Sequence, residues 1–259
     1  MRLSLSACLP LLVFVLLMAG LETGLRLFEI PTYFFPYPSG VFDALLNQPV
    51  RFLEALLETA LSAGTGLLLS AVFGVLMALV LSLHPWIRKA FYPYAVFFQT
   101  VPIIAIAPML VVWFGYGRNA IVASAFIVSV FPMIANCLTG LLSSDRLLVD
   151  LFRLYGAPPW ALLLKLRIPT ALPFFLTGLR IASGLSVIGA LVGEFVADTL
   201  NDGGGIGTLI VVSIKEQRSD QVFAAVLLAS LLGLGFFGAV STFAALTRRV
   251  FHIGETREN

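Results

Sequence analysis

Long apolar runs separated by short polar segments dominate the chain. A helix needs about 20 mostly apolar residues to cross the hydrocarbon core of a bilayer, which is about 30 Å thick. The first run could also be a secretory signal peptide, but it exceeds the roughly 7–15 apolar residues of such a peptide, so we expect an uncleaved span. The pattern predicts an all-α polytopic membrane protein with six transmembrane helices, over residues 3–21, 59–83, 94–114, 120–142, 173–197 and 222–246.

The composition agrees with a membrane protein. Hydrophobic residues make up 59% of the chain and charged residues 12%, whereas a soluble domain carries about 25% charged residues. The net charge of +2 by itself indicates no particular partner. We expect contact with membrane lipid and none with nucleic acid. Cys8, Cys137, His84 and His252 are isolated in the sequence, so neither a metal site nor a disulfide framework is predicted.

The distribution of Lys and Arg predicts the orientation. Segments between spans that carry more Lys and Arg tend to stay on the cytoplasmic side. With six spans and the N-terminus inside, most of these residues fall on the inner side, among them Arg88, Lys89, Lys165 and Arg167. The protein is therefore expected to be multi-pass with both termini cytoplasmic.

Three regions follow along the chain. Residues 1–58 hold the first span and an outer segment, in which Pro31, Pro36 and Pro38 predict an irregular loop before an amphipathic lead-in helix. Residues 59–248 form the transmembrane domain, with an inner loop at about 143–171. Residues 249–259 form a cytoplasmic tail.

The inner loop predicts two short helices with a break between them. The first covers DRLLVDLFRLY, and Gly156 then permits a turn that a Cβ would hinder. Pro158 and Pro159 suit the start of the second helix, because the first helical turn needs no N–H donors. The pairs ending in Pro169 and Pro173 are expected to end it before the next span. Such an element either docks a soluble partner or lies on the lipid headgroups.

This loop resembles the "EAA" loop of inner-membrane permeases of binding-protein-dependent ABC importers. Asp150-Leu151-Phe152 stands at the Glu-Ala-Ala positions. An acidic residue therefore occupies the Glu position, and both alanines are replaced by bulky residues. The family glycine and proline positions are occupied as well. The resemblance implies a loop that couples to an ATPase, with Asp150, Gly156, Ala157, Pro158, Ile168, Pro169 and Pro173 as its residues.

Flanking phrases resemble the nitrate, sulfonate and taurine branch of that family, which also serves thiamine-precursor pyrimidines. They are QTVPIIAIAPMLVVWFGYG, SVFPMIANCLTGL and GLRIASGLSVIGALVGEFVAD. The resemblance implies the type I ABC importer permease fold in a bacterial inner membrane, and a translocation path for a small solute. The implied partners are cytoplasmic ABC ATPase subunits, an extracytoplasmic solute-binding protein and a second, usually identical, permease subunit.

The chain lacks the phosphate-binding motif G-x-x-x-x-G-K-[ST]. We therefore expect no catalytic residue and no cofactor in this chain, with ATP bound by the partner subunit. The glycine run at 203–207 has no lysine and is interpreted as a flexible loop before a short outer helix. A secondary transporter or channel with six spans is the alternative, although neither an internal repeat nor a mid-membrane carboxylate supports the former.

Two charged residues fall within the fifth span. Arg180 and Glu194 are candidates for the translocation path or a gate, together with Ser183 and Ser186 among the many small residues of that span. The alternatives are that Arg180 extends to the inner headgroups and that Glu194 is an interfacial acid. The small residues serve either tight helix packing or the path.

Overall fold

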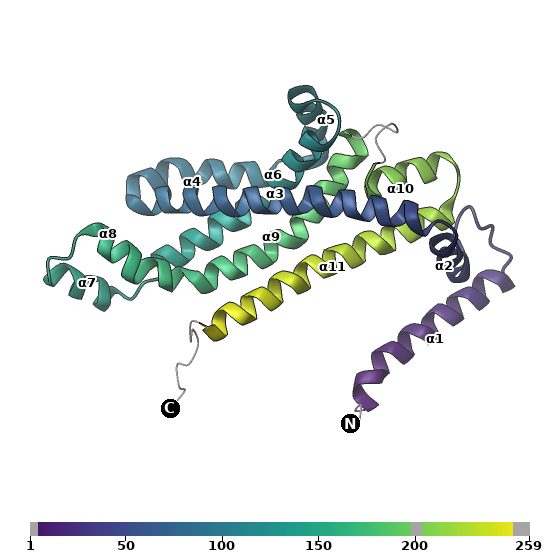
Figure 1. Cartoon of the computed structure of the whole chain (residues 1–259), viewed down its shortest axis with the longest axis horizontal. Helices are drawn as coiled ribbons and strands as arrows, with labels where there is room; N and C mark the ends of the chain where they lie inside the picture. Colours follow the sequence, from purple (N-terminus) through teal and green to yellow (C-terminus); the bar gives the residue numbers. More distant parts are fainter. Residues whose placement is uncertain (1–4, 198–203, 251–259) are drawn as a thin grey trace.

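The computed structural model describes residues 5–197 and 204–250, and every regular element in these ranges is helical. The start of the first predicted span and residues 251–259 of the predicted tail lie outside the described residues. Figure 1 shows α3, α6, α9 and α11 running along the long axis, with α7 and α8 at one end and α2 and α10 at the other. The helices are α1 Leu5–Leu27, α2 Pro38–Asn47, α3 Pro49–Leu83, α4 Pro85–Thr100, α5 Ile103–Phe114, α6 Arg118–Leu142, α7 Arg146–Leu154, α8 Pro159–Leu162, α9 Ile168–Ala197, α10 Ile206–Lys215 and α11 Ser219–Val250.

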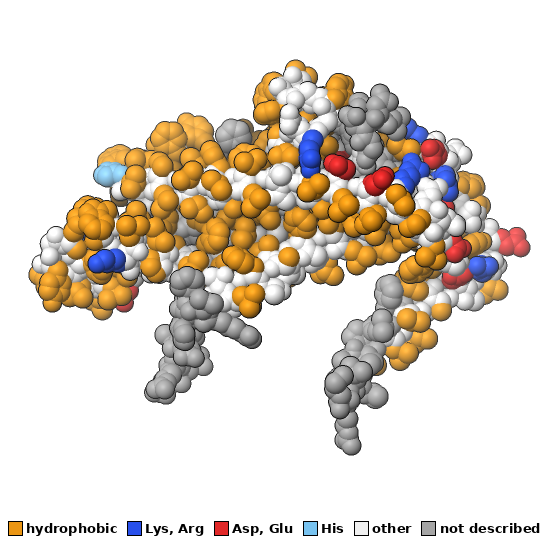
Figure 2. Space-filling model, viewed as in Figure 1, with side chains coloured by type: hydrophobic (Ala, Val, Ile, Leu, Met, Phe, Trp, Pro, Cys, Tyr) orange, Lys and Arg blue, Asp and Glu red, His pale blue; other side chains and the backbone are white. Residues whose placement is uncertain are grey.

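Helices long and apolar enough to cross a membrane number four in the described ranges. They are Pro49–Leu83, Arg118–Leu142, Pro159–Ala197 and Ser219–Arg248. The predicted spans 120–142 and 222–246 lie within the second and fourth of these and are confirmed. The predicted span 59–83 is also helical, but α3 begins earlier, at Pro49, and so includes the lead-in helix expected before it. Hydrophobic side chains cover the middle of the bundle (Figure 2).

The centre of the bundle depends on small residues. A Cβ on Gly66 or Gly74 of α3 would collide with Ala125 or Met133 of α6. A Cβ on Gly189 of α9 would stand 2.7 Å from the Cα of Ala125. Close backbone approach of this kind is how helices associate in lipid, where no hydrophobic effect drives them together. The interpretation of the α9 small residues as packing residues is confirmed for those that are buried: Gly178, Ala182, Ser183, Ser186, Gly189, Ala190 and Gly193.

The predicted third span, 94–114, is wrong as a single helix. The chain breaks at Val101 and Pro102, which separate α4 from α5. Proline lacks an N–H donor and disfavours helical geometry in the residue before it, and Val101 is extended, with φ −72° and ψ 124°. The 12 residues of α5 reach only about 18 Å, so α5 cannot cross the bilayer by itself. The count of six spans stays a prediction.

The prolines after the inner loop do not end a helix, contrary to expectation. The chain stays helical from Pro159 to Ala197 and passes through Pro169 and Pro173. A π-helical turn over Leu163–Arg167 precedes Pro169, and the Ile168 N–H donates to the Leu163 carbonyl. Such a wider turn relieves the crowding that a proline ring imposes on the preceding turn. The fifth span therefore starts well before Pro173.

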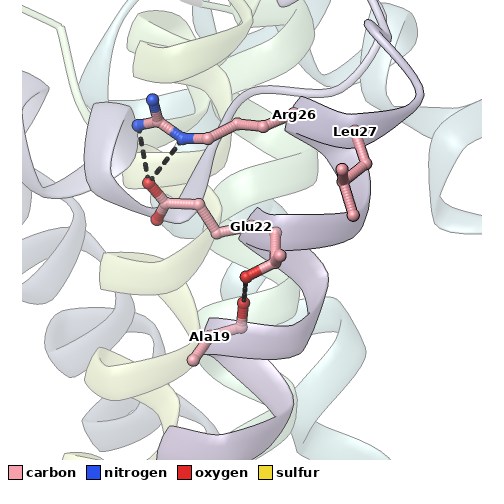
Figure 3. Close-up of a pocket in the computed structure, with 5 residues that line it drawn as sticks. Ala19, Glu22, Arg26 and Leu27 are labelled. Atoms are coloured by element: carbon pink, nitrogen blue, oxygen red, sulfur yellow. Dashed lines mark hydrogen bonds and ion pairs between the residues drawn. The ribbon is translucent and has the colours of Figure 1, made fainter.

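The first helix is joined to the rest by a polar contact at its C-terminal end. Glu22 accepts hydrogen bonds from Arg26 Nη2 at 2.7 Å and from the Ser39 hydroxyl at 2.8 Å. Figure 3 shows Glu22 and Arg26 facing each other one turn apart, and the Arg26 guanidinium lies 4.8 Å from the Tyr37 ring centroid. The predicted irregular loop is thus short, since Pro38 opens α2 instead of breaking a helix. Figure 1 shows α1 set apart from the bundle.

Candidate functional site

The inner loop folds as the sequence predicts up to its second helix. Asp145 caps α7 by accepting the Leu147 N–H at 2.9 Å. At the other end the Gly156 N–H donates to the Arg153 carbonyl at 2.9 Å, and the Ala157 N–H donates to the Phe152 carbonyl at 3.0 Å. This pair of bonds is a Schellman motif, which needs a left-handed residue at the position of Gly156. Gly156 has φ +64°, so its role in the turn is confirmed, and Pro158 and Pro159 open α8 as expected.

The loop presents apolar side chains that the chain itself does not cover. Leu147, Leu151 and Leu154 recur at helical spacing on α7, and Leu147 and Leu154 are 78% and 84% exposed. Asp150 forms only a weak ion pair with Arg153, at 3.5 Å between exposed side chains. The apolar face of α7 is thus free to meet lipid headgroups or a partner protein.

The predicted coupling residues fall into two groups. Asp150, Gly156, Ala157 and Pro158 lie on α7 and in the turn that follows it. Ile168, Pro169 and Pro173 lie in the first turns of α9, beyond the π-helical turn. The continuous helix from Pro159 to Ala197 therefore connects the loop directly to the middle of the bundle.

The structure separates the predicted path residues. Ser183 and Ser186 are fully buried, and each hydroxyl donates to a carbonyl one turn earlier. Both therefore face the helix packing of this single chain. Arg180 is partly exposed, and its guanidinium lies 5.8 Å from the Phe237 ring centroid of α11. Glu194, 14 residues further along, lies about 21 Å away along the helix.

Glu194 is only 2% exposed and lies at the N-terminus of α10. Its carboxylate accepts the Gly207 N–H at 2.7 Å. Thr59 of α3 accepts the neighbouring Ile206 N–H at 2.8 Å. The first N–H groups of a helix have no partner within that helix, so α3 and α9 together supply acceptors for the start of α10. The sequence analysis does not predict the contribution of Thr59, because no local sequence signal connects Thr59 to Ile206, 147 positions away.

The glycines beside Glu194 make this contact possible. A Cβ on Gly205 or Gly207 would overlap the Glu194 side chain. The short outer helix expected after the glycine run is present as α10. Gly205 and Gly207 therefore serve close packing around a carboxylate.

The comparison with known families decides the identity. The family described as "Binding-protein-dependent transport system inner membrane component" matches residues 70–251. The chain belongs to this family. It is a multi-pass inner-membrane permease subunit of an ABC importer, and it forms the translocation path for a small solute. The alternative of a secondary transporter or channel is set aside.

Two relatives and one solved structure agree with this family assignment. The formylaminopyrimidine transport permease protein ThiX of Halalkalibacterium halodurans is 36% identical over 93% of the permease and 94% of its own length. The taurine transport system permease protein TauC of Escherichia coli is 28% identical over 80% of the permease and 78% of its own length. The crystal structure of a bacterial ABC transporter that imports alginate matches with a TM-score of 0.65 at 18% identity, over 89% and 95% of the two chains. The permease thus has the type I importer fold, in the sulfonate and taurine branch.

Replacement of Glu194 by leucine is expected to destabilise the permease. It leaves the buried Gly207 N–H without its acceptor, a loss of about 1–3 kcal/mol, or roughly 5 °C in the midpoint of thermal unfolding for a chain of this size. The midpoint is measured on the detergent-purified protein. Glu194→Gln keeps an acceptor oxygen and is expected to lose less. Equal loss in both variants would show that the hydrogen bond to α10 is not the cause.

Proposed function

We propose that the loop from Asp145 to Arg167 docks a cytoplasmic ATPase subunit, which binds and hydrolyses ATP for this permease. The observation that carries the proposal is the uncovered apolar face of α7, which ends in a left-handed Gly156. These residues stand where the family has its coupling loop. The permease itself binds no cofactor and catalyses no reaction in this proposal.

Movement of the loop reaches the translocation path through α9. A helix that is continuous from Pro159 to Ala197 transmits a displacement at its start along its whole length. α9 carries Arg180 at mid-length and Glu194 near its far end. Glu194 in turn holds the start of α10. Closure of the docked ATPases would thus move the centre of the bundle and α10 together. This movement would open the translocation path to one side of the membrane and then to the other.

The remaining partners follow from the same arrangement. An extracytoplasmic binding protein would meet the end that carries α2 and α10, and both termini would be cytoplasmic. We infer that a second, identical permease subunit completes the path. The solute would be a small organic molecule of the kind that the names of ThiX and TauC give for those proteins.

Co-purification with the ATPase subunit tests the docking surface. Leu154→Glu places a charge on the exposed apolar face of α7. We expect the amount of retained ATPase to fall about tenfold, which corresponds to a loss of about 1.4 kcal/mol in the free energy of binding. Leu46→Glu makes the same change on α2, where Leu46 is also highly exposed, and should retain the ATPase. Retention by both variants would place the docking surface elsewhere.

Two differently tagged copies of the permease test the dimer. Co-expression followed by purification through one tag is expected to recover the other tag with the ATPase present. Recovery of a single tag would exclude the identical second subunit and require a different permease chain as the partner.

A further inference from the structure

An apolar groove lies between α3, α6 and α9, near the end of the bundle that carries α7 and α8. It has a volume of about 300 Å³ and is lined by apolar side chains from all three helices, among them Val75, Leu79, Leu141, Ile168, Ala171 and Phe175. Along α9 it extends from Ile168 to Phe175, about 10 Å. Leu141 and Ala171 are buried, whereas Ile168 is exposed, so the groove is open at this end. Its length and apolar lining suit part of a hydrocarbon chain.

Arg167 closes the open end of the groove. It is the last residue of the π-helical turn and directly precedes Ile168. Its Nη1 atom donates to the Ser82 carbonyl at 3.5 Å, and Ser82 lies one turn beyond the groove residue Leu79 on α3. The guanidinium therefore bridges α3 and α9 where the groove ends. Within the described ranges this long hydrogen bond is its one polar contact, so most of its five N–H donors are available to another partner.

Exposed tryptophans indicate that this end lies at the membrane surface. Trp86 at the start of α4 is 74% exposed, and Trp160 of α8 is 63% exposed. Figure 1 shows α8 and the start of α4 at the same end of the bundle. Tryptophan is enriched where the bilayer meets water, with its ring at the level of the lipid headgroups. Arg167 therefore lies at the depth of lipid phosphates.

Basic residues collect at this end and have no acidic partner. The following form no ion pair with any described residue: Arg88, Lys89, Lys165 and Arg167. Asp145 caps α7 and Asp150 pairs with Arg153 on the same helix, so neither acid neutralises the open end of the groove. Basic pockets between membrane-spanning helices on the cytoplasmic side attract anionic lipid headgroups, and a guanidinium matches the geometry of a phosphate.

We propose that this groove binds an anionic phospholipid, with one acyl chain between α3, α6 and α9 and the phosphate on Arg167. The surrounding lipid tails are as apolar as the groove, so the chain gains little by entering it. It fills the space and restores the van der Waals contacts that an empty gap loses. Selectivity for a negative headgroup therefore comes from Arg167 and its basic neighbours. This lipid is distinct from the transported solute, and its binding does not depend on where the ATPase docks.

Photo-crosslinking in nanodiscs tests the site. The full-length permease, purified with the ATPase that it retains, is placed in bilayers that contain phosphatidylglycerol or phosphatidylcholine with a photoactivatable diazirine on one acyl chain. Mass spectrometry locates the crosslinked peptides. We expect phosphatidylglycerol to label the peptides around Leu79, Leu141 and Leu172 about fivefold more than phosphatidylcholine does, the factor that one basic residue contributes near an anionic headgroup. Arg167→Gln is expected to remove this preference, and Arg167→Lys to keep most of it.

The matched control removes a charge from the same end outside the groove. Lys89 lies on α4, with its Nζ atom 5.9 Å from the Trp86 ring centroid, and Lys89→Gln should keep the preference. Leu172→Trp fills the groove and should abolish labelling there while Arg167 is retained. Equal labelling by the two lipids, a preference that survives in Arg167→Gln, or no labelling of these peptides by either lipid would overturn the proposal. Retained ATPase is measured on the same samples, and its loss in Arg167→Gln with unchanged labelling would assign Arg167 to the docking surface instead.

Discussion

Replacement of Gly156 by valine is expected to reduce the ATPase that co-purifies with this permease about tenfold or more. Gly156 has φ +64°, and a left-handed conformation costs a residue with a Cβ roughly 1–2 kcal/mol, with β-branched residues the least tolerant. Valine therefore opposes the bonds from Gly156 and Ala157 to the Arg153 and Phe152 carbonyls. The end of α7 then frays, and its apolar face loses its geometry.

The control for this experiment is Gly156→Asn. Asparagine tolerates the left-handed conformation better than valine, and a Cβ at this position meets no heavy atom within 4 Å. We expect Gly156→Asn to retain much more ATPase than Gly156→Val, with both variants inserted in the membrane in equal amounts. Equal loss in the two variants would mean that the partner contacts Gly156 itself, and that the backbone conformation is not what matters.

Two glycines on α9 are expected to respond to alanine with opposite signs. In Gly189→Ala the new Cβ would stand 2.7 Å from the Ala125 Cα and 2.8 Å from the Ser124 carbonyl oxygen. Both are backbone atoms, so α6 and α9 must separate, which we expect to cost about 1–3 kcal/mol. In Gly184→Ala the Cβ meets open space, and the better helix propensity of alanine stabilises by about 0.5–1 kcal/mol.

The midpoint of thermal unfolding of the purified permease measures this pair. A change of 1 kcal/mol in the free energy of unfolding shifts this midpoint by roughly 2–4 °C for a chain of 150–250 residues. We therefore expect the midpoint of Gly189→Ala to fall by several degrees and that of Gly184→Ala to rise slightly. Similar decreases in both variants would indicate that glycine flexibility matters along α9. Close packing against α6 would then not be the reason for Gly189.

The inner loop was largely predictable because its signals are local. A capping Asp145, an apolar repeat, a glycine and a proline pair act within a few residues of themselves, and α7, Gly156 and the start of α8 are found where these signals stand. The effect of the later prolines was not predictable in this way. Pro102 ends a helix, while Pro169 lies within one after a π-helical turn. Sequence alone does not separate the two cases, because the outcome depends on how neighbouring helices hold the backbone.

The candidate path residues show a further limit of the sequence. Arg180, Ser183, Ser186 and Glu194 share one apolar span, and their spacing does not reveal what each faces. The fold buries the two serines against packing helices, places Glu194 at the start of α10 and sets the Arg180 guanidinium against the Phe237 ring of α11. These differences arise from contacts between residues distant in the chain.

By itself, the sequence determined that the protein is helical, spans a membrane and carries a loop of two short helices that turns at Gly156, because apolar run length and local turn chemistry act along the chain. Only the tertiary structure decided that the third apolar run is two helices, that Thr59 and Glu194 jointly hold α10, and that Arg180 packs against the Phe237 ring and forms no ion pair with any described residue. The physical reason is that burial, register and charge compensation depend on which helices meet, and that is set by close approach at residues such as Gly189.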